Sequence, residues 1–177
     1  MPEFAEFTDD SGDLDPLPVL VSALANEDVR ACATLAAARE DEPMDRWIGA
    51  FQRALEDDRQ LVLVARSGSD LVGYGKASWL QLPADCNAPS GWYLTGVVVD
   101  PAVRRRGVGR LLTRARLIEL RRRGVRQVWY FANALNQASL ALHAHLGFGE
   151  ITRDFAIPGV TFSGGQGVLA CWDAASN

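Results

Sequence analysis

The chain has 177 residues, of which 48% are hydrophobic and 23% charged, a balance typical of one globular domain of ordinary size. No apolar run approaches the ~18 residues that a membrane-spanning helix needs, and the acidic start lacks the basic flank and apolar core of a secretory signal. The three cysteines lie far apart without a CxxC pair, which is a poor framework for disulfides or for zinc. The composition therefore predicts a cytoplasmic protein with no metal site and no membrane partner.

The net charge of −4 conceals an uneven distribution. Seventeen of the eighteen basic residues are arginine, and ten of these fall between Arg104 and Arg126. Acidic residues gather before Asp58, with a dense group at Glu40, Asp41, Glu42 and Asp45. The basic segment is suited to anions, whereas the acidic one either meets a cation or forms a solvated face.

Taken in chain order, the sequence predicts alternating strands and helices after a polar, acidic and flexible arm at residues 1–16. Asn26 is expected to cap the first helix and Pro43 to begin the second. The predicted strands are 19–23, 61–65, 71–80, 92–99, 125–132, 155–157 and 167–172, and the later helices are 108–123 and 136–146. Alternation in the middle and hairpins at the ends indicate an α+β class, with one mixed sheet in a single domain over residues 17–177.

The chemistry is concentrated where the strand at 92–99 leads through a turn into the helix that starts at Val108. The first N–H groups of a helix have no internal partner and lie at the positive end of its dipole, so they form an anion site. Gly107 and Gly109 have no Cβ, which lets a bulky pyrophosphate approach the backbone. Neighbouring arginines add charge for further phosphate oxygens. The segment therefore predicts a phosphate site at Arg104, Arg105, Arg106, Gly107, Val108, Gly109 and Arg110.

Two other phosphate-binding motifs fit this segment less well. A P-loop requires Lys followed by Ser or Thr after its last glycine, and no such pair follows Gly109. A dinucleotide-binding fingerprint requires a third glycine where Leu112 stands.

The segment resembles motif A of the GNAT superfamily of acetyltransferases, Arg/Gln-x-x-Gly-x-Gly/Ala, which Arg104, Gly107 and Gly109 match. Downstream, the run from Asn136 to Phe148 resembles the second motif of that superfamily. The likeness covers roughly residues 60–150. It implies a GNAT-like fold, with a twisted, mostly antiparallel sheet of about six to seven strands and about four helices. A fainter likeness to aminoglycoside 6′-N-acetyltransferases lies in Trp92-Tyr-Leu.

The resemblance also implies acetyl-CoA as cosubstrate and assigns residues to it. A central strand is expected to splay from its neighbour, and Gly96 supplies a position for the bulge that this requires. By analogy, the backbone of the segment Val97, Val98 and Val99 pairs with pantetheine and the thioester carbonyl. Asn136 and Ser139 meet the cosubstrate from the second motif.

His143 departs from the pattern, because the family usually has a tyrosine there that protonates the departing coenzyme A. Asn136, Ser139 and His143 follow helical spacing and so share one face. An imidazole with a pKa near ~6.5 can donate to a thiolate whose acid has a pKa near ~8.5. His143 is therefore a candidate acid that also contacts the cosubstrate; the alternative is a packing residue that replaces an aromatic ring.

The implied reaction is direct acetyl transfer to a primary amine, with a strand N–H that stabilises the oxyanion. Candidates for the base are Tyr93 and a water near Tyr130. No cysteine has a basic neighbour that would support a covalent intermediate.

Several alternatives stay open at the level of sequence. The acceptor is a small molecule, such as an aminoglycoside or polyamine, or a peptide. The same fold could serve as a non-catalytic acyl-CoA sensor. Arg104–Arg126 could instead form a nucleic-acid-binding module, which the negative net charge disfavours. The oligomeric state is undetermined, with a homodimer as one option.

Overall fold

The computed structural model describes residues 15–175, and seven strands of this range form one mixed sheet. Their order is β1-β2-β3-β4-β5-β7-β6, and the pairing between β4 and β5 is parallel, whereas β1–β2, β2–β3, β5–β7 and β6–β7 are antiparallel. The strands are β1 (Leu20–Ala23), β2 (Gln60–Ser67), β3 (Asp70–Leu80), β4 (Gly91–Val99), β5 (Gln127–Asn133), β6 (Gly149–Thr152) and β7 (Gly167–Asp173). The α-helices in this range are α1 (Val29–Glu40), α2 (Met44–Glu56), α3 (Val108–Arg122) and α4 (Gln137–His145). The predicted α+β class is confirmed.

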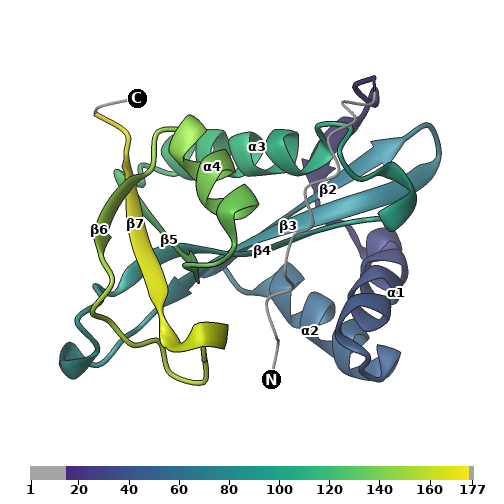
Figure 1. Ribbon diagram of the computed structural model, residues 1–177. Helices are drawn as coiled ribbons and strands as arrows, with labels where there is room; N and C mark the ends of the chain where they lie inside the picture. The colour runs from purple at the N-terminus through teal and green to yellow at the C-terminus, as the bar shows by residue number, and fades with distance from the viewer. Residues whose placement is uncertain (1–14, 176–177) are drawn as a thin grey trace. The chain divides into compact units, whose positions relative to one another are not determined.

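The described chain falls into two compact units, of which the first comprises residues 15–78 and 95–119. Within it, α1 and α2 cover one face of strands β2 and β3, and the N-terminal part of α3 covers the other face (Figure 1). The core of this unit includes Phe51 of α2, whose ring meets Tyr74 of β3 edge-on at 5.0 Å between centroids. Burial on both faces explains why β2 reads as a continuous apolar run.

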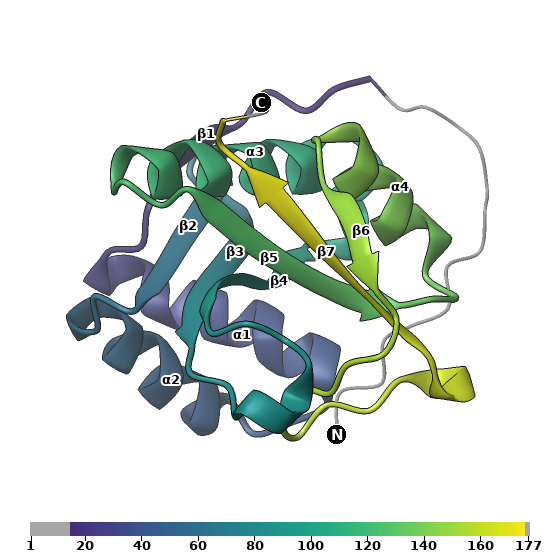
Figure 2. The same ribbon diagram turned by 90° about the vertical axis from the view of Figure 1, so that its left-hand side faces the viewer.

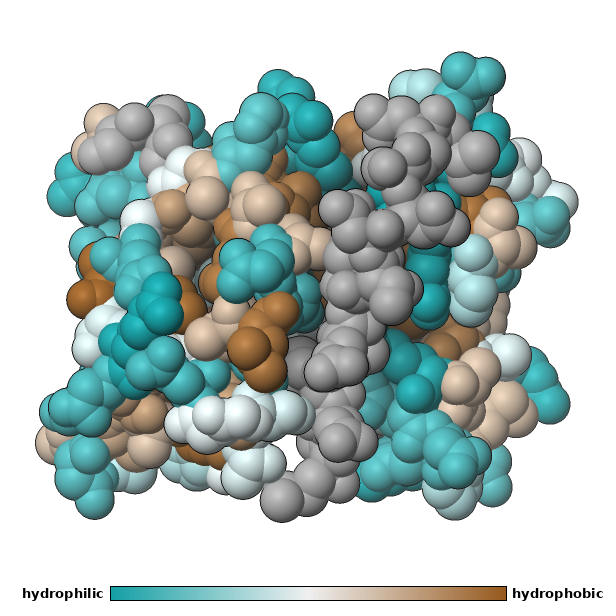
Figure 3. Space-filling model, in the orientation of Figure 1, coloured by the Kyte–Doolittle hydropathy of each residue, from teal (hydrophilic) through white to brown (hydrophobic). Residues whose placement is uncertain are grey.

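The second unit comprises residues 79–94 and 120–175, in which β5, β7 and β6 lie side by side (Figure 2). Strand β7 pairs with β5 along its whole length: Gln127 lies opposite Asp173 at one end, and Asn133 lies opposite Gly167 at the other. Brown and tan residues lie over α4 in Figure 3, in keeping with the apolar sequence of that helix. Tyr93, Ile157 and Leu169 are buried together at the centre of a second hydrophobic cluster.

Both expected helix starts in the N-terminal half need correction. Asn26 lies in a 3-10 turn, Asn26–Asp28, and α1 begins after it, so Asn26 does not cap the helix. Instead, the buried Asp28 carboxylate accepts the Ala25 N–H at 2.9 Å and forms an ion pair with Arg66 of β2. Pro43 is the N-cap of α2 rather than its first residue. Both helices therefore begin one or two residues after the predicted positions.

The strand expected at 155–157 is wrong, because the structure places β6 at Gly149–Thr152 instead. Phe155 packs against the second hydrophobic cluster and Ile157 is one of its buried members. Their apolar character therefore reflects burial in a loop and not strand pairing, since short apolar runs do not distinguish the two.

The buried face of α3 is not made of its apolar residues alone. Leu111 and Ile118 are 42% and 45% exposed. Thr113 and Arg116 are buried in the same helix at 0% and 1%. The positions of the apolar residues alone therefore do not show which face of α3 is buried.

Residues 1–14 of the predicted N-terminal arm lie outside the described residues. No helix in the described range is both long enough and apolar enough to cross a membrane.

Candidate active site

The predicted phosphate site is a turn with two left-handed residues that leads from β4 into α3. Asp100 starts it, with a side chain that accepts the Ala102 N–H at 2.9 Å. The backbone then passes through positive φ at Arg105 (63°) and Gly107 (82°). The Leu111 N–H donates to the Gly107 carbonyl at 3.0 Å, which closes the first turn of the helix. The N–H groups before Leu111 therefore have no acceptor within the helix and mark its positive end.

The arginines of the turn also brace it. Arg104 Nε donates to the Val99 carbonyl at 3.2 Å, and Arg106 Nε donates to the Asp15 carbonyl at 3.0 Å. The Arg106 carbonyl also accepts the Leu17 N–H, so Arg106 bonds to the backbone of both Asp15 and Leu17. These bonds fix the side chains of Arg104 and Arg106, and with them two positive charges, beside the start of α3.

The two glycines of the motif serve different purposes. Gly107 adopts a φ that L side chains rarely adopt. A Cβ at Gly109 would lie 3.8 Å from a Val99 methyl group, an ordinary contact, with nothing nearer. Gly109 is therefore not demanded by packing.

Strand β4 carries its own irregularity just before the turn. Gly96 has a φ of 144° and is exposed although β4 is an interior strand of the sheet, and a Cβ there would meet nothing within 4 Å. The Val97 carbonyl accepts a hydrogen bond from Arg39 Nη1 at 2.9 Å. Val98 is buried in the core of the first unit. Arg39 stands 58 residues from Val97, so this contact could not be predicted from local sequence.

The second motif forms a compact polar cluster at the start of α4. Asn136 caps the helix, with a side-chain oxygen that accepts the Ser139 N–H at 3.1 Å. The Ser139 hydroxyl lies 2.6 Å from the hydroxyl of Tyr130 on β5. Burial raises the pKa of Tyr130 to about 12, so its phenol stays protonated at neutral pH.

His143 lies within the same cluster and is 5% exposed. Its ring stacks on Tyr130 at 3.5 Å between centroids and 9° between planes, and Phe148 meets it edge-on at 5.2 Å. Nδ1 donates to the Ser139 carbonyl at 2.8 Å, which fixes the orientation of the ring. The structure therefore brings Ser139, His143 and Tyr130 together, and each side chain is held by at least one other.

Tyr93 has the environment of a structural residue. Its side chain is fully buried, its hydroxyl donates to the Pro89 carbonyl at 2.7 Å, and its ring packs against Trp129 and Phe131. Burial raises its pKa to about 12. A neutral phenol that already donates its proton is poorly suited to accept one from an amine.

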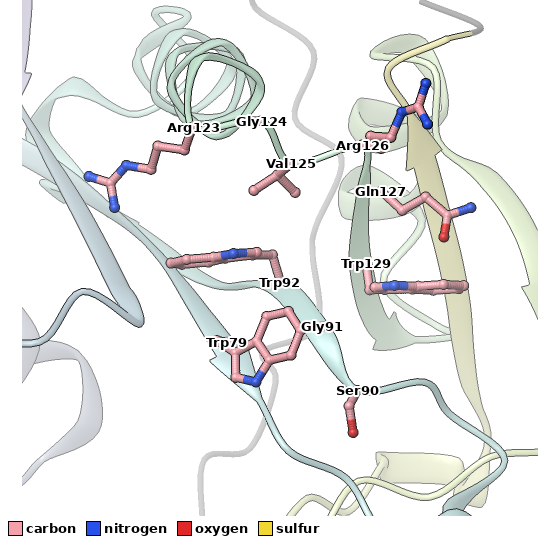
Figure 4. Close-up of a pocket in the computed structure, with 10 residues that line it drawn as sticks. All are labelled: Trp79, Ser90, Gly91, Trp92, Arg123, Gly124, Val125, Arg126, Gln127 and Trp129. Carbon is pink, nitrogen blue, oxygen red and sulfur yellow. The ribbon is translucent and has the colours of Figure 1, made fainter.

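A separate pocket of about 360 Å³ is lined by three of the five tryptophans, Trp79, Trp92 and Trp129 (Figure 4). The side chains of Arg123 and Arg126 point away from its centre (Figure 4). None of the residues predicted for acetyl transfer lines it. In the described range no cluster of His, Cys, Asp and Glu could hold a metal ion.

Residues 20–148 match the Acetyltransferase (GNAT) family. N-alpha-acetyltransferase RimI of Mycobacterium tuberculosis is 35% identical over 139 residues, which cover 77% of this chain and 82% of that protein. The ribosomal protein bS18-alanine N-acetyltransferase of Escherichia coli K12 is 42% identical over 59 residues, or 33% of this chain and 40% of that protein.

Solved structures show the same fold. The ribosomal-protein-S18-alanine N-acetyltransferase from Escherichia coli superimposes with a TM-score of 0.66 at 23% identity, over 88% of this chain and 94% of that one. The acetyltransferase yncA from Salmonella typhimurium, solved with its cofactor acetyl-CoA, has a TM-score of 0.66 at 18% identity, over 88% and 93%. The protein is thus an acyltransferase. It belongs to the GNAT acetyltransferase family, whose acetyl donor is acetyl-CoA.

Proposed function

We propose that this protein transfers an acetyl group from acetyl-CoA directly to the α-amine of a peptide or protein N-terminus. The observation that carries the donor half is the turn at Arg104–Arg110. There the start of a 15-residue helix, two arginines braced against the backbone and an uncrowded Gly109 meet in one compact unit. Such a helix start suits the pyrophosphate of coenzyme A.

Two features support an N-terminal amine over a polycation. The M. tuberculosis relative is named an N-alpha-acetyltransferase. The acidic group that could have attracted a polycation is partly neutralised within the chain, since Glu40 pairs with Arg39 at 3.3 Å and Glu42 pairs with Arg46. Aminoglycosides and polyamines are therefore the weaker acceptor candidates.

The fraction of each amine that is neutral at pH 7 supports the same choice. An α-amine with a pKa near 8 is about 10% neutral at pH 7, whereas a lysine-like amine near 10.4 is only about 0.04% neutral. An N-terminal acceptor thus needs less help from a base, which matters because Tyr93 is an unsuitable one. We assign no proton transfer to Tyr93.

The reaction follows from these parts. The neutral amine nitrogen attacks the thioester carbon, and the carbonyl oxygen takes up the negative charge. We place the Val97 N–H against that oxygen, because the exposed Gly96 leaves room beside it and the Val97 carbonyl is already bonded to Arg39. The C–S bond then breaks, the nitrogen loses its proton to water, and the thiolate takes up a proton.

We assign the proton that the thiolate receives to Nε2–H of the His143 imidazolium, because Nδ1–H is already donated to the Ser139 carbonyl. The proton that the amine releases to water then restores the imidazolium. The ring is fixed by its stack on Tyr130 and by the bond from Nδ1 to the Ser139 carbonyl, so that its other nitrogen is held in one place. A fixed acid is more effective than a mobile one, because no ordering is needed in the transition state.

The test is thiol release from acetyl-CoA with a panel of three acceptors. The panel holds a peptide with a free N-terminus and no lysine, the same peptide with a blocked N-terminus and one lysine, and a polyamine. We expect turnover only with the free N-terminus. Faster turnover of the blocked peptide or of the polyamine would overturn the acceptor assignment. Binding of acetyl-CoA with no turnover of any amine would instead identify an acyl-CoA sensor.

We also propose the cytoplasm as its compartment, which its free cysteines, Cys32, Cys86 and Cys171, support.

A further inference from the structure

Arg116 of α3 is a buried cation whose hydrogen-bond partners are backbone carbonyls and one hydroxyl. Its Nη1 donates to the carbonyl of Lys76 at 2.6 Å and to that of Gly96 at 2.9 Å. Nη2 donates to the Thr113 hydroxyl at 2.9 Å, and Nε donates to the Leu112 carbonyl at 3.3 Å. Within residues 15–175 the guanidinium therefore bonds to both β3 and β4 and pairs with no carboxylate.

Stability alone does not account for this arrangement. Transfer of a charge out of water is unfavourable, and burial lowers the pKa of Arg116 to about 9. Strand β3 also has a glycine, Gly75, beside the guanidinium, where a Cβ would lie only 2.8 Å from Arg116 Nε. An apolar residue at position 116 would fill such a space at a lower cost in desolvation.

The bond to Gly96 acts on the peptide unit that the proposed reaction uses. The Gly96 carbonyl and the Val97 N–H belong to one peptide group, and they point to opposite sides because that group is trans. A hydrogen bond donated to a peptide carbonyl polarises the group and makes its N–H a stronger donor. A full positive charge on the donor increases this effect.

A second set of bonds joins the same guanidinium to the phosphate turn. Thr113 accepts from Arg116 Nη2, and its hydroxyl donates to the Gly109 carbonyl at 2.8 Å. Both side chains are buried, so these bonds are shielded from competing water. The irregular part of β4 and the first turn of α3 are therefore connected through Arg116 and Thr113.

We propose that Arg116 is a positioning residue for acetyl transfer, which strengthens the Val97 N–H as oxyanion donor and fixes the Gly96–Val97 peptide relative to the start of α3. The inference rests on the proposed function, in which the Val97 N–H faces the thioester oxygen. Arg116 itself touches neither the donor nor the acceptor.

The experiment compares Arg116→Met, which removes the charge, and Arg116→Lys, which keeps it, with Arg114→Met on the exposed side of the same helix. Loss of one full oxyanion donor lowers kcat about 10²–10³-fold, so loss of its polarisation alone should lower kcat on the order of tenfold. We expect this decrease in Arg116→Met, partial recovery in Arg116→Lys and no change in Arg114→Met. The Kd of acetyl-CoA should stay within threefold.

A readout on the free protein separates this role from simple packing. The amide proton of Val97, observed by NMR, should move upfield in both Arg116 variants relative to wild type and stay in place in Arg114→Met. If Arg116→Met does not fold, Arg116→Lys and Thr113→Val carry the same comparison, with Thr113→Val lowering kcat less. An unmoved Val97 amide, or a kcat within twofold of wild type in a folded Arg116 variant, overturns the inference. Absence of acetyl-CoA binding in wild type would refute the proposed function, while the Val97 shift would still report on Arg116.

Discussion

Replacement of His143 by phenylalanine separates the proposed proton donor from a packing residue. Phenylalanine keeps a planar ring for the stack on Tyr130 and for the edge contact with Phe148. What the variant loses is the imidazole nitrogens, including the Nδ1–H that donates to the Ser139 carbonyl at 2.8 Å. The substitution is thus close to a removal of the proton chemistry with the packing retained.

The structure sets the expected cost in stability. One neutral hydrogen bond contributes about 0.5–1.5 kcal/mol net, and the aromatic stack is kept, so the free energy of unfolding should fall by about 1 kcal/mol. For a chain of this size that corresponds to a decrease in Tm of about 2–4 °C. Acid catalysis is worth about 10²–10⁴ in rate, so kcat should fall at least ~100-fold while the Kd of acetyl-CoA changes less than threefold.

The assay is thiol release with the preferred amine, combined with a thermal melt of each variant. His143→Tyr should recover part of the activity by returning a hydroxyl donor, and His145→Phe on the exposed side of α4 is the matched control. If His143→Phe keeps more than a third of the wild-type kcat, His143 is a packing residue and the thiolate takes its proton from water.

Three further predictions follow from the same geometry. Acetyl-CoA at 100 times its Kd should stabilise the fold by about 2.7 kcal/mol, and no thermal shift at millimolar acetyl-CoA would refute the donor site. Gly109→Glu should abolish acetyl-CoA binding in a folded protein, because the carboxylate adds bulk and negative charge at the helix start. Gly109→Ala should leave the stability of the fold unchanged, since its Cβ meets only Val99 at 3.8 Å. Binding by the Glu variant within threefold of wild type would place the phosphates elsewhere. Asp28→Ala should lower the free energy of unfolding, measured in urea, by about 2 kcal/mol. This is less than the ~3–5 kcal/mol expected for a fully buried ion pair, because the Arg66 side chain is 29% exposed. An unchanged urea midpoint would show that the ion pair contributes nothing to stability.

The parts of this protein that depend on neighbours along the chain were predictable from its residues. The turn from Arg104 to Val108 needed only a strand, a left-handed glycine and the periodicity of a helix, all of which are local. The helix expected to begin at Asn136 was also predicted, although the cap was not: the Asn136 side chain accepts the N–H three residues ahead. Local propensity and hydrogen bonding act over these short distances and leave a readable pattern.

Contacts between side chains far apart in the chain depend on how the backbone folds in space. Nothing near Arg39 in the sequence points to the Val97 carbonyl, and Tyr130 meets Ser139 and His143 only because β5 and α4 pack together. The burial of Arg116 was hidden for a related reason. An arginine in a helix is usually expected at the surface. Arg116 is buried because Gly75 has no side chain in the space that its guanidinium fills and because the Gly96 carbonyl accepts its hydrogen bond. These two residues lie 41 and 20 positions away along the chain. Such contacts depend on the three-dimensional path of the backbone, which no local pattern records.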